Sequence, residues 1–194
     1  ENNSNVTIID LSGVPFEVLS ITVSLISRLL FEFGYYYTRL RHSNTPTERI
    51  NNDTPFLLVY EEAHKYVPNS DLAKYRASKE SIERIAKEGR KFGVMMDLVT
   101  QRPTELSETV LSQCSNFLIF KINHPADLEY IEKMVPNISS DVLEKQKSLQ
   151  AGTCVAFGKM MKIPMIVKME LPNPEPQSSN AHVFDKWMIQ WKTN

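Results

Sequence analysis

The feature that most constrains the fold of this 194-residue sequence is a continuous apolar run, Phe56 to Tyr60, that ends at two adjacent carboxylates, Glu61 and Glu62. An apolar run without alternation is typical of a strand covered on both faces, so we expect a central strand of a parallel sheet. Open α/β sheets bind ligands outside the carboxyl ends of their strands. The two acids therefore lie where a ligand site is expected.

Strand-like and helical patterns alternate along the rest of the chain. Apolar, β-branched runs predict further strands at residues 6–11, 94–100 and 117–122. Apolar positions at helical spacing predict helices at about residues 15–41, 78–92, 107–113, 126–135 and 140–146. Residues 153–157 and 162–169 are expected to pair as a hairpin. This order predicts an α/β fold with an antiparallel far edge.

Adjacent side chains on a strand point to opposite sides, so Glu61 and Glu62 can take different roles. Glu61 can hold Mg²⁺ through a water molecule, and Glu62 can polarise an attacking water. One strand later, Gln101 follows Thr100 at the equivalent strand end, where its amide can donate to a phosphate or accept from water. Phosphoryl transfer needs groups of these kinds. The alternatives are a solvated acidic pair and an amide that stabilises a turn.

Basic residues gather near the end of the helix expected at 78–92, and Gly93 is expected to end that helix. Cations at this end are favourable for the helix dipole alone. Arg90 lies next to the apolar face of the helix. From a subunit edge it could reach the nucleotide of a neighbouring subunit, where an arginine stabilises transition-state charge. The residues leave both interpretations open.

The overall charge does not indicate a nucleic-acid partner, because 22 basic residues face 23 acidic ones and the net charge is −1. Any contact with DNA must therefore be local. The loop expected from Asn69 to Lys79 carries Lys74, Arg76 and Lys79, and it is the candidate for lining a central pore. The alternative is an ordinary solvated surface.

No membrane segment is expected, because Glu17, Arg28 and Glu32 interrupt the apolar stretch 18–33 before it reaches the ~20 residues that span a bilayer. The stretch is expected to be a core helix. Cys114 and Cys154 are too few for a disulfide framework and lack metal-ligand spacing. Such cysteine usage indicates a reducing, cytoplasmic location.

The last segment, residues 171–194, begins with a proline-rich linker and continues with apolar positions at helical spacing between Val183 and Trp191. We expect this segment to act as a brace, because its apolar stripe is too large to leave in water. It could dock on its own subunit or on a neighbouring one. The linker does not decide between them.

Three motifs together resemble the HerA branch of the FtsK/HerA family of ATPases, and the likeness extends over about residues 6–169. They are Leu58-Val59-Tyr60-Glu61-Glu62-Ala63-His64, Ala86-Lys87-Glu88-Gly89-Arg90-Lys91-Phe92-Gly93 and Thr100-Gln101-Arg102-Pro103. The resemblance implies that residues 1–170 are the C-terminal part of a three-layer, RecA-like P-loop sheet. It also implies a hexameric ring that uses ATP and Mg²⁺ to move along double-stranded DNA. Such rings often work with a nuclease or another effector, including in antiphage defence.

Carried over by position, the resemblance gives Glu61 the Mg²⁺-side role, Glu62 the role of catalytic base, Gln101 that of sensor and Arg90 that of the arginine acting in trans. Glu61 departs from the Asp more usual in P-loop ATPases. No Gly-x-x-x-x-Gly-Lys-[Ser/Thr] motif occurs, since Gly158-Lys159 is followed by Met160. We expect that motif to precede this region in the full-length protein, and this chain alone to be inactive.

Two other functions compete with a HerA-type motor. Glu61-Glu62-Ala63-His64 also resembles the Asp-Glu-Ala-His box of superfamily-two helicases, but Thr100-Gln101-Arg102-Pro103 stands where those enzymes carry a Ser-Ala-Thr motif. A nucleotide-binding ring that organises an effector is the non-enzymatic alternative. Dependence of the biological effect on Glu62 separates the motor from the scaffold.

Overall fold

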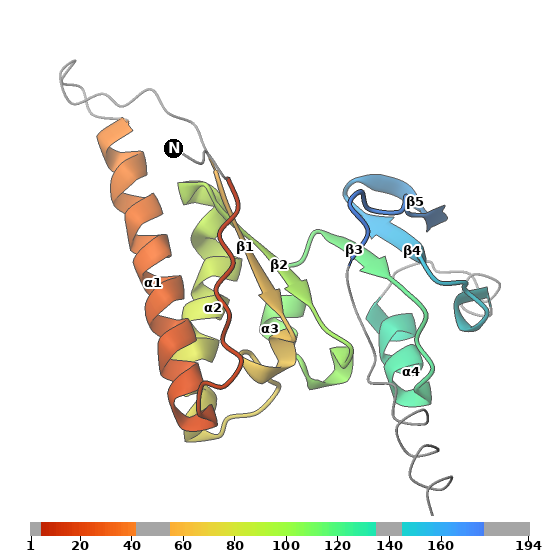
Figure 1. Cartoon of the computed structure of the whole chain (residues 1–194), viewed down its shortest axis with the longest axis horizontal. Helices are drawn as coiled ribbons and strands as arrows, with labels where there is room; N and C mark the ends of the chain where they lie inside the picture. The colour runs from red at the N-terminus through yellow and green to blue at the C-terminus, as the bar shows by residue number, and fades with distance from the viewer. Residues whose placement is uncertain (1–4, 42–54, 135–144, 177–194) are drawn as a thin grey trace, which may run out of the picture.

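The computed structural model describes residues 5–41, 55–134 and 145–176, and it shows a mixed α/β arrangement with two small sheets (Figure 1). The parallel sheet and its surroundings comprise α1 (Phe16–Arg41), β1 (Phe56–Glu61), η1 (Ala63–Lys65), η2 (Ala73–Tyr75), α2 (Arg76–Glu88), η3 (Gly89–Phe92), β2 (Val94–Val99), η4 (Pro103–Glu105) and α3 (Glu108–Leu111). The antiparallel sheet and its helix comprise β3 (Asn116–Ile119), α4 (Pro125–Met134), β4 (Thr153–Gly158) and β5 (Met161–Lys168).

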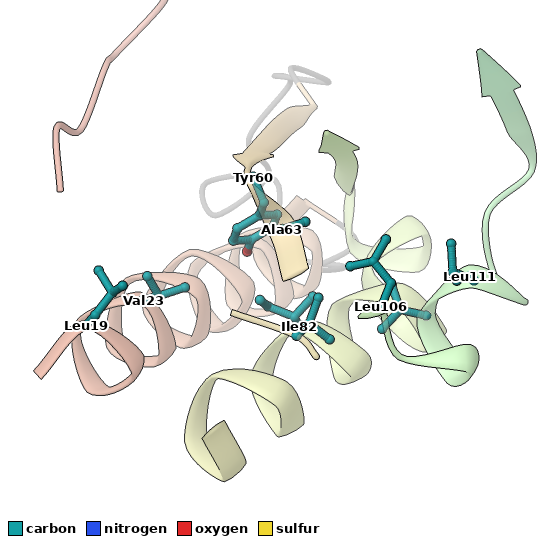
Figure 2. Close-up of a cluster of buried hydrophobic side chains, with 9 residues drawn as sticks. Leu19, Val23, Tyr60, Ala63, Ile82, Leu106 and Leu111 are labelled. Carbon is teal, nitrogen blue, oxygen red and sulfur yellow. The ribbon is translucent and has the colours of Figure 1, made fainter. Parts of the chain in front are cut away.

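The parallel pairing of β1 with β2 confirms the arrangement expected from the apolar run. The register aligns Phe56 with Val94 and Glu61 with Val99, so both strands end at the same edge of the sheet. One face of this pair packs against α1 and α2. Figure 2 shows the resulting core, in which Leu19 and Val23 from α1 and Ile82 from α2 lie around Tyr60.

Small residues let α1 lie close to α2 and β2. Ser20 bonds to Ser78 across the two helices at 3.0 Å between hydroxyl oxygens, and Ser27 bonds to the buried hydroxyl of Tyr60 at 2.8 Å. A Cβ atom added at Gly34 would lie 2.6 Å from the side chain of Val94 and 2.9 Å from the carbonyl oxygen of Phe92. Burial raises the pKa of the Tyr60 phenol, so that group stays neutral and paired.

The outer side of α1 is apolar as well. Large apolar side chains at helical spacing are about half exposed along its whole length, namely Val18, Ile21, Leu25, Leu29, Phe33, Tyr36 and Leu40. By length and composition α1 could cross a membrane, and it alone passes that test among the described residues. Its inner side is buried against α2 and β1.

The expectation that the Phe56–Tyr60 strand is covered on both faces is not met within the described residues. Leu57 and Val59 are each 58% exposed, and Met95 and Val99 on the neighbouring strand are also exposed. Helices cover only the opposite face of the pair. An apolar run shows that both faces of a strand suit burial, but it does not specify which elements cover them.

The strand expected at residues 6–11 is also wrong: these residues form no ladder with the rest of the described chain. Ile8 and Ile9 are exposed along an extended segment that leads into α1 (Figure 1). A β-strand exists only where a second strand supplies hydrogen-bond partners. The β-branched composition of this segment therefore indicated a strand preference that does not lead to a ladder in the described part of the chain.

The predicted hairpin is confirmed as β4 and β5, which pair antiparallel, but it belongs to a separate sheet and not to the far edge of the parallel one. The strand expected at 117–122 forms as β3, but it joins β4 instead of extending the parallel sheet. Phe117 stacks on Phe157 at 4.8 Å between ring centroids and also contacts the core beside β1, so one side chain belongs to both cores. The helices predicted at 126–135 and 78–92 form as α4 and as α2 with η3.

Gly93 ends η3 with φ at 71°, as predicted. The helix expected at 107–113 is the short α3. Most of the helix predicted at 140–146 and the brace predicted between residues 183 and 191 lie outside the described residues. The boundary predicted at residue 170 follows the end of β5, and the brace itself remains a prediction.

Candidate catalytic site at the ends of two parallel strands

The in-register pairing of β1 and β2 brings Glu62 and Gln101 together. Glu62 follows the last residue of β1, and Gln101 is the second residue after β2. The Gln101 Nε2 atom donates a hydrogen bond to Glu62 Oε1 at 3.2 Å. Two residues that the sequence placed at equivalent strand ends therefore form one polar site.

Glu62 has an unusual backbone conformation. Its φ and ψ are 54° and 45°, and it alone among the described non-glycine residues has a positive φ. This left-handed turn ends β1 and starts η1, where Lys65 N–H donates to the carbonyl oxygen of Glu62 at 2.9 Å. A non-glycine residue in such a region costs on the order of 1–3 kcal/mol, and such residues cluster at active sites.

The strain at Glu62 gives a stability prediction. We expect Glu62→Gly to make the full-length protein more stable than Glu62→Ala, by about 1 kcal/mol, because only alanine meets the left-handed penalty. Both variants lose the same carboxylate, so their difference isolates the backbone term. Thermal unfolding of the two variants side by side measures it, and equal stabilities would contradict a left-handed Glu62.

His64 holds the other oxygen of the Glu62 carboxylate. Its Nδ1 atom lies 3.4 Å from Glu62 Oε2 and 3.1 Å from Thr100 Oγ1. The His64 side chain is only 13% exposed, compared with 34% for Glu62. Sequence reasoning gave neither His64 nor Thr100 a role. The one available signal was their place in the motifs: His64 follows Glu62 by two positions, and Thr100 directly precedes Gln101.

Glu61 lies apart from this network. It is exposed and alternates along β1 with the exposed Leu57 and Val59, which places it on the uncovered face of the sheet. No hydrogen bond or ion pair joins its carboxylate to another described residue. Burial first, and then the charges of Glu61 and Glu62, raise the pKa of Tyr66.

An exposed carboxylate that makes no bond to the described protein suits a water-mediated contact with Mg²⁺, which keeps several waters in most proteins. No cluster of three metal-ligating side chains occurs in the part of the chain that the structure describes. The donor set therefore fits a single carboxylate beside a hydrated cation, and not a complete protein cage.

Backbone hydrogen bonds tie together the loops that follow the two strands. Asn69 N–H donates to the carbonyl oxygen of Glu105 at 2.6 Å, and Ser107 N–H donates to that of Val67 at 3.0 Å. The Ser107 hydroxyl also donates to Glu83 of α2 at 2.7 Å. Sites on such rigidly connected segments hold their side chains more precisely than free loops do.

Arg102 is a further charged group at this edge that sequence reasoning did not select. Its Nη1 atom bonds to Glu105 Oε1 at 2.8 Å. The hydrogen bond and charge of Glu105 raise the pKa of Arg102, and the negative charges of Glu62 and Asp127 add to the rise. Asp127 in turn accepts from the hydroxyl of Thr104 at 2.8 Å, which anchors η4 to α4. The Arg102 guanidinium is thus near enough to Glu62 and Asp127 to feel their charges.

Arg90 is not brought to this site. It is exposed in η3, which precedes β2, whereas Gln101 follows the carboxyl end of that strand. Six strand residues at ~3.3 Å each place the two ends about 20 Å apart. Within one subunit Arg90 therefore lies near the amino ends of the strands, whereas Glu62 lies at their carboxyl ends.

The basic segment after β1 is partly helical, and the expectation of a loop from Asn69 to Lys79 is wrong. Lys74 lies in η2, while Arg76 begins α2. The Lys79 ammonium bonds to Asp71 Oδ1 at 3.0 Å and to the carbonyl oxygen of Ser70 at 3.3 Å. Cations at the start of a helix oppose its dipole, so the dipole does not explain this group.

No family model matches the sequence, but several curated proteins do. The DNA double-strand break repair helicase HerA of Saccharolobus solfataricus is 37% identical over 159 residues, which cover 79% of this chain and 31% of that protein. HerA of Sulfurisphaera tokodaii is 32% identical over 184 residues, which cover 94% and 35%. A probable helicase of Methanocaldococcus jannaschii is 41% identical over 133 residues, which cover 69% and 25%. The chain thus spans a quarter to about a third of these relatives.

Among solved structures, the genome packaging NTPase B204 of Sulfolobus turreted icosahedral virus 2 in complex with AMP aligns at a TM-score of 0.49 with 21% identity. The alignment covers 84% of this chain and 65% of that one. The same NTPase in complex with ATP-gammaS aligns at a TM-score of 0.48 with 23% identity, over 59% of this chain and 52% of that one. Similarity at these scores adds nothing to the sequence comparison, and the assignment rests on the curated relatives. Over most of its length, the chain is homologous to the HerA family of DNA helicases.

Proposed function

We propose that the full-length protein is an ATP-hydrolysing motor of the HerA type that moves along double-stranded DNA, and that this chain supplies the acid, the sensor and the arginine of its catalytic site. One observation carries the proposal. At the shared carboxyl edge of β1 and β2, Gln101 donates a hydrogen bond to one oxygen of the Glu62 carboxylate, and His64 Nδ1 lies 3.4 Å from the other. That edge is where open α/β sheets bind ligands.

The chemistry proposed for this edge uses Glu62 as a general base. Its carboxylate retains lone pairs after the hydrogen bond from Gln101 and the contact with His64, so it can accept a proton from a water held against it. Gln101 is placed to orient that water as well as the carboxylate. Glu61 is the group of this chain that would hold hydrated Mg²⁺, and MgATP supplies the phosphoryl group that the water attacks.

The position of Arg90 supports a ring. An arginine about 20 Å from Glu62 cannot serve the site of its own subunit, but in a closed ring each subunit presents one edge to the site of the next. The exposed apolar stripe of α1 and the uncovered face of β1 and β2 also support further protein contacts. We propose a homohexamer, which is the ring that the resemblance to HerA-type ATPases implies.

Other parts of the proposal rest on the resemblance alone. These are the work with a nuclease or another effector, the role in antiphage defence and the cytoplasmic location. The curated relatives named HerA favour a HerA-type motor over a superfamily-two helicase. Hydrolysis of ATP that double-stranded DNA stimulates and that requires Glu62 tests the motor. A ring whose biological effect survives loss of hydrolysis would be the scaffold instead.

The basic segment gives a prediction about DNA. In the full-length protein we expect the combined replacement of Lys74, Arg76 and Lys79 by alanine to weaken DNA binding equally for all sequences, because phosphate contacts carry no sequence information. The slope of log affinity against log salt should fall by roughly 0.9 for each phosphate that the protein no longer neutralises. Fluorescence anisotropy with duplex DNA over a range of salt measures the slope.

The matched control replaces three exposed lysines elsewhere by alanine, namely Lys145, Lys147 and Lys159. This control removes the same charge, so it should lower affinity only slightly and leave the slope nearly unchanged. If the first triple replacement leaves the salt slope unchanged, the segment does not contact DNA phosphates and is an ordinary solvated surface.

A further inference from the structure

We propose that His64 is a positioning residue, whose imidazole lies against the Glu62 carboxylate and is hydrogen-bonded to Thr100 on the neighbouring strand. This inference rests on the proposed function, because it assumes that Glu62 is the base. It adds a residue that neither the motif positions nor the comparisons assign. Its basis is the single imidazole nitrogen that faces both Glu62 and Thr100.

The negative charge of Glu62 favours the tautomer of His64 that carries its proton on Nδ1. Nδ1 lies 3.4 Å from the Glu62 carboxylate, and an unprotonated nitrogen there would direct its lone pair at a negative charge. A proton on Nδ1 replaces that repulsion by attraction to the carboxylate. Nδ1–H then donates to Thr100 Oγ1 at 3.1 Å and lies 3.4 Å from Glu62 Oε2.

Thr100 completes the network. Its hydroxyl oxygen also accepts from the backbone N–H of Arg102 at 3.0 Å. A hydroxyl oxygen accepts two hydrogen bonds, so the Arg102 N–H and the His64 Nδ1–H together fill it. The Thr100 oxygen is thereby fixed from its own strand end, and it holds the imidazole in place. Through Thr100 and His64, the loop after β2 therefore restrains where the Glu62 carboxylate after β1 can lie.

The backbone of Glu62 explains why its carboxylate needs two supports. A left-handed residue directs its side chain away from the path of the strand. With His64 removed, Gln101 alone would hold Glu62, through one bond of 3.2 Å between two exposed side chains. The carboxylate could then rotate away from the water. Misplacement of a catalytic group by about 1 Å can lower a rate on the order of 100-fold.

Substitutions at His64 separate positioning from packing. An asparagine amide nitrogen occupies nearly the place of Nδ1, whereas a glutamine amide reaches the place of Nε2, and both are polar and of similar size. In the full-length protein we expect His64→Ala and His64→Gln to lower kcat roughly 10-fold to 100-fold with KM for ATP unchanged. His64→Asn should remain within about threefold of the wild-type kcat.

Thr100 and Glu62 provide the paired tests. We expect Thr100→Val to lower kcat in the same direction and Thr100→Ser to preserve it, because only serine keeps the acceptor oxygen. His64→Ala should add nothing in a Glu62→Gln background, since the two residues act as one unit. Thermal unfolding of each variant identifies losses that reflect folding.

The outcomes distinguish this inference from the proposed function. If Glu62→Gln hydrolyses ATP at the wild-type rate, the proposed function fails. If Glu62→Gln is inactive while His64→Ala keeps the wild-type kcat, only the role of His64 fails. Equal kcat values for folded His64→Asn and His64→Gln variants would also overturn it, because packing alone does not distinguish the two amides.

Discussion

Glu62→Gln in the full-length protein is expected to remove ATP hydrolysis by a factor of roughly 100 to 10,000 while nucleotide binding stays intact. The amide has the shape of the carboxylate, but it cannot accept a proton from the attacking water. Its oxygen still accepts one hydrogen bond, from either Gln101 or His64, so the site should stay assembled. Because only the chemical step is affected, kcat should fall and KM should not rise.

The measurement combines steady-state phosphate release with equilibrium binding of a non-hydrolysable ATP analogue. Glu88→Gln is the matched control, since Glu88 is an exposed glutamate at the end of α2, away from the site. The control should leave both quantities near the wild-type values. Phosphate release by Glu62→Gln at the wild-type rate would show that Glu62 is not the general base.

Arg90→Ala is expected to lower kcat by a factor of about 1,000 or more, although Arg90 lies about 20 Å from Glu62 in its own subunit. An arginine that stabilises transition-state charge from a neighbouring subunit has effects of this size. Lys91→Ala removes a neighbouring exposed charge and should change the rate little. If Arg90 only served the helix dipole, both variants would behave alike and lose a fraction of a kcal/mol of stability.

Mixing two inactive variants tests whether Arg90 acts in trans. Rings assembled from equal amounts of Arg90→Ala and Glu62→Gln subunits place an intact Glu62 next to an intact Arg90 at about a quarter of the interfaces. Hydrolysis should therefore reappear in the mixture, at a rate well above that of either variant alone. A mixture that stays inactive, despite mixed rings demonstrated by mass, would show that both residues must belong to one subunit.

The position of the candidate site was predictable from the sequence because it depends on local pattern. The apolar run before Glu61 and the apolar run before Gln101 each indicate a buried strand, and parallel strands end at a common edge. The structure confirms that these strands are adjacent and end at one edge, and it adds a hydrogen bond from Gln101 to Glu62 that was not predicted. Gly93 and the β4–β5 hairpin were predictable for the same reason, since turn chemistry is set by a few adjacent residues.

The residues that complete the site were not predictable in this way. His64 and Thr100 are 36 positions apart, and their contact depends on how η1 leaves β1. That exit depends on the left-handed backbone of Glu62, which a glutamate does not favour by itself. Tertiary contacts must hold such a residue in place, and a single sequence does not display them.

By itself, the sequence determined which segments suit strands and helices, and which side chains stand at the strand ends. The tertiary structure decided which strands pair and which faces are covered. Residues 117–122 suited any sheet, and the antiparallel ladder with β4, in which Phe117 stacks on Phe157, places β3 in the antiparallel one. Residues 6–11 have the composition of a strand and form none, because propensity is a property of the segment, whereas a ladder requires a partner.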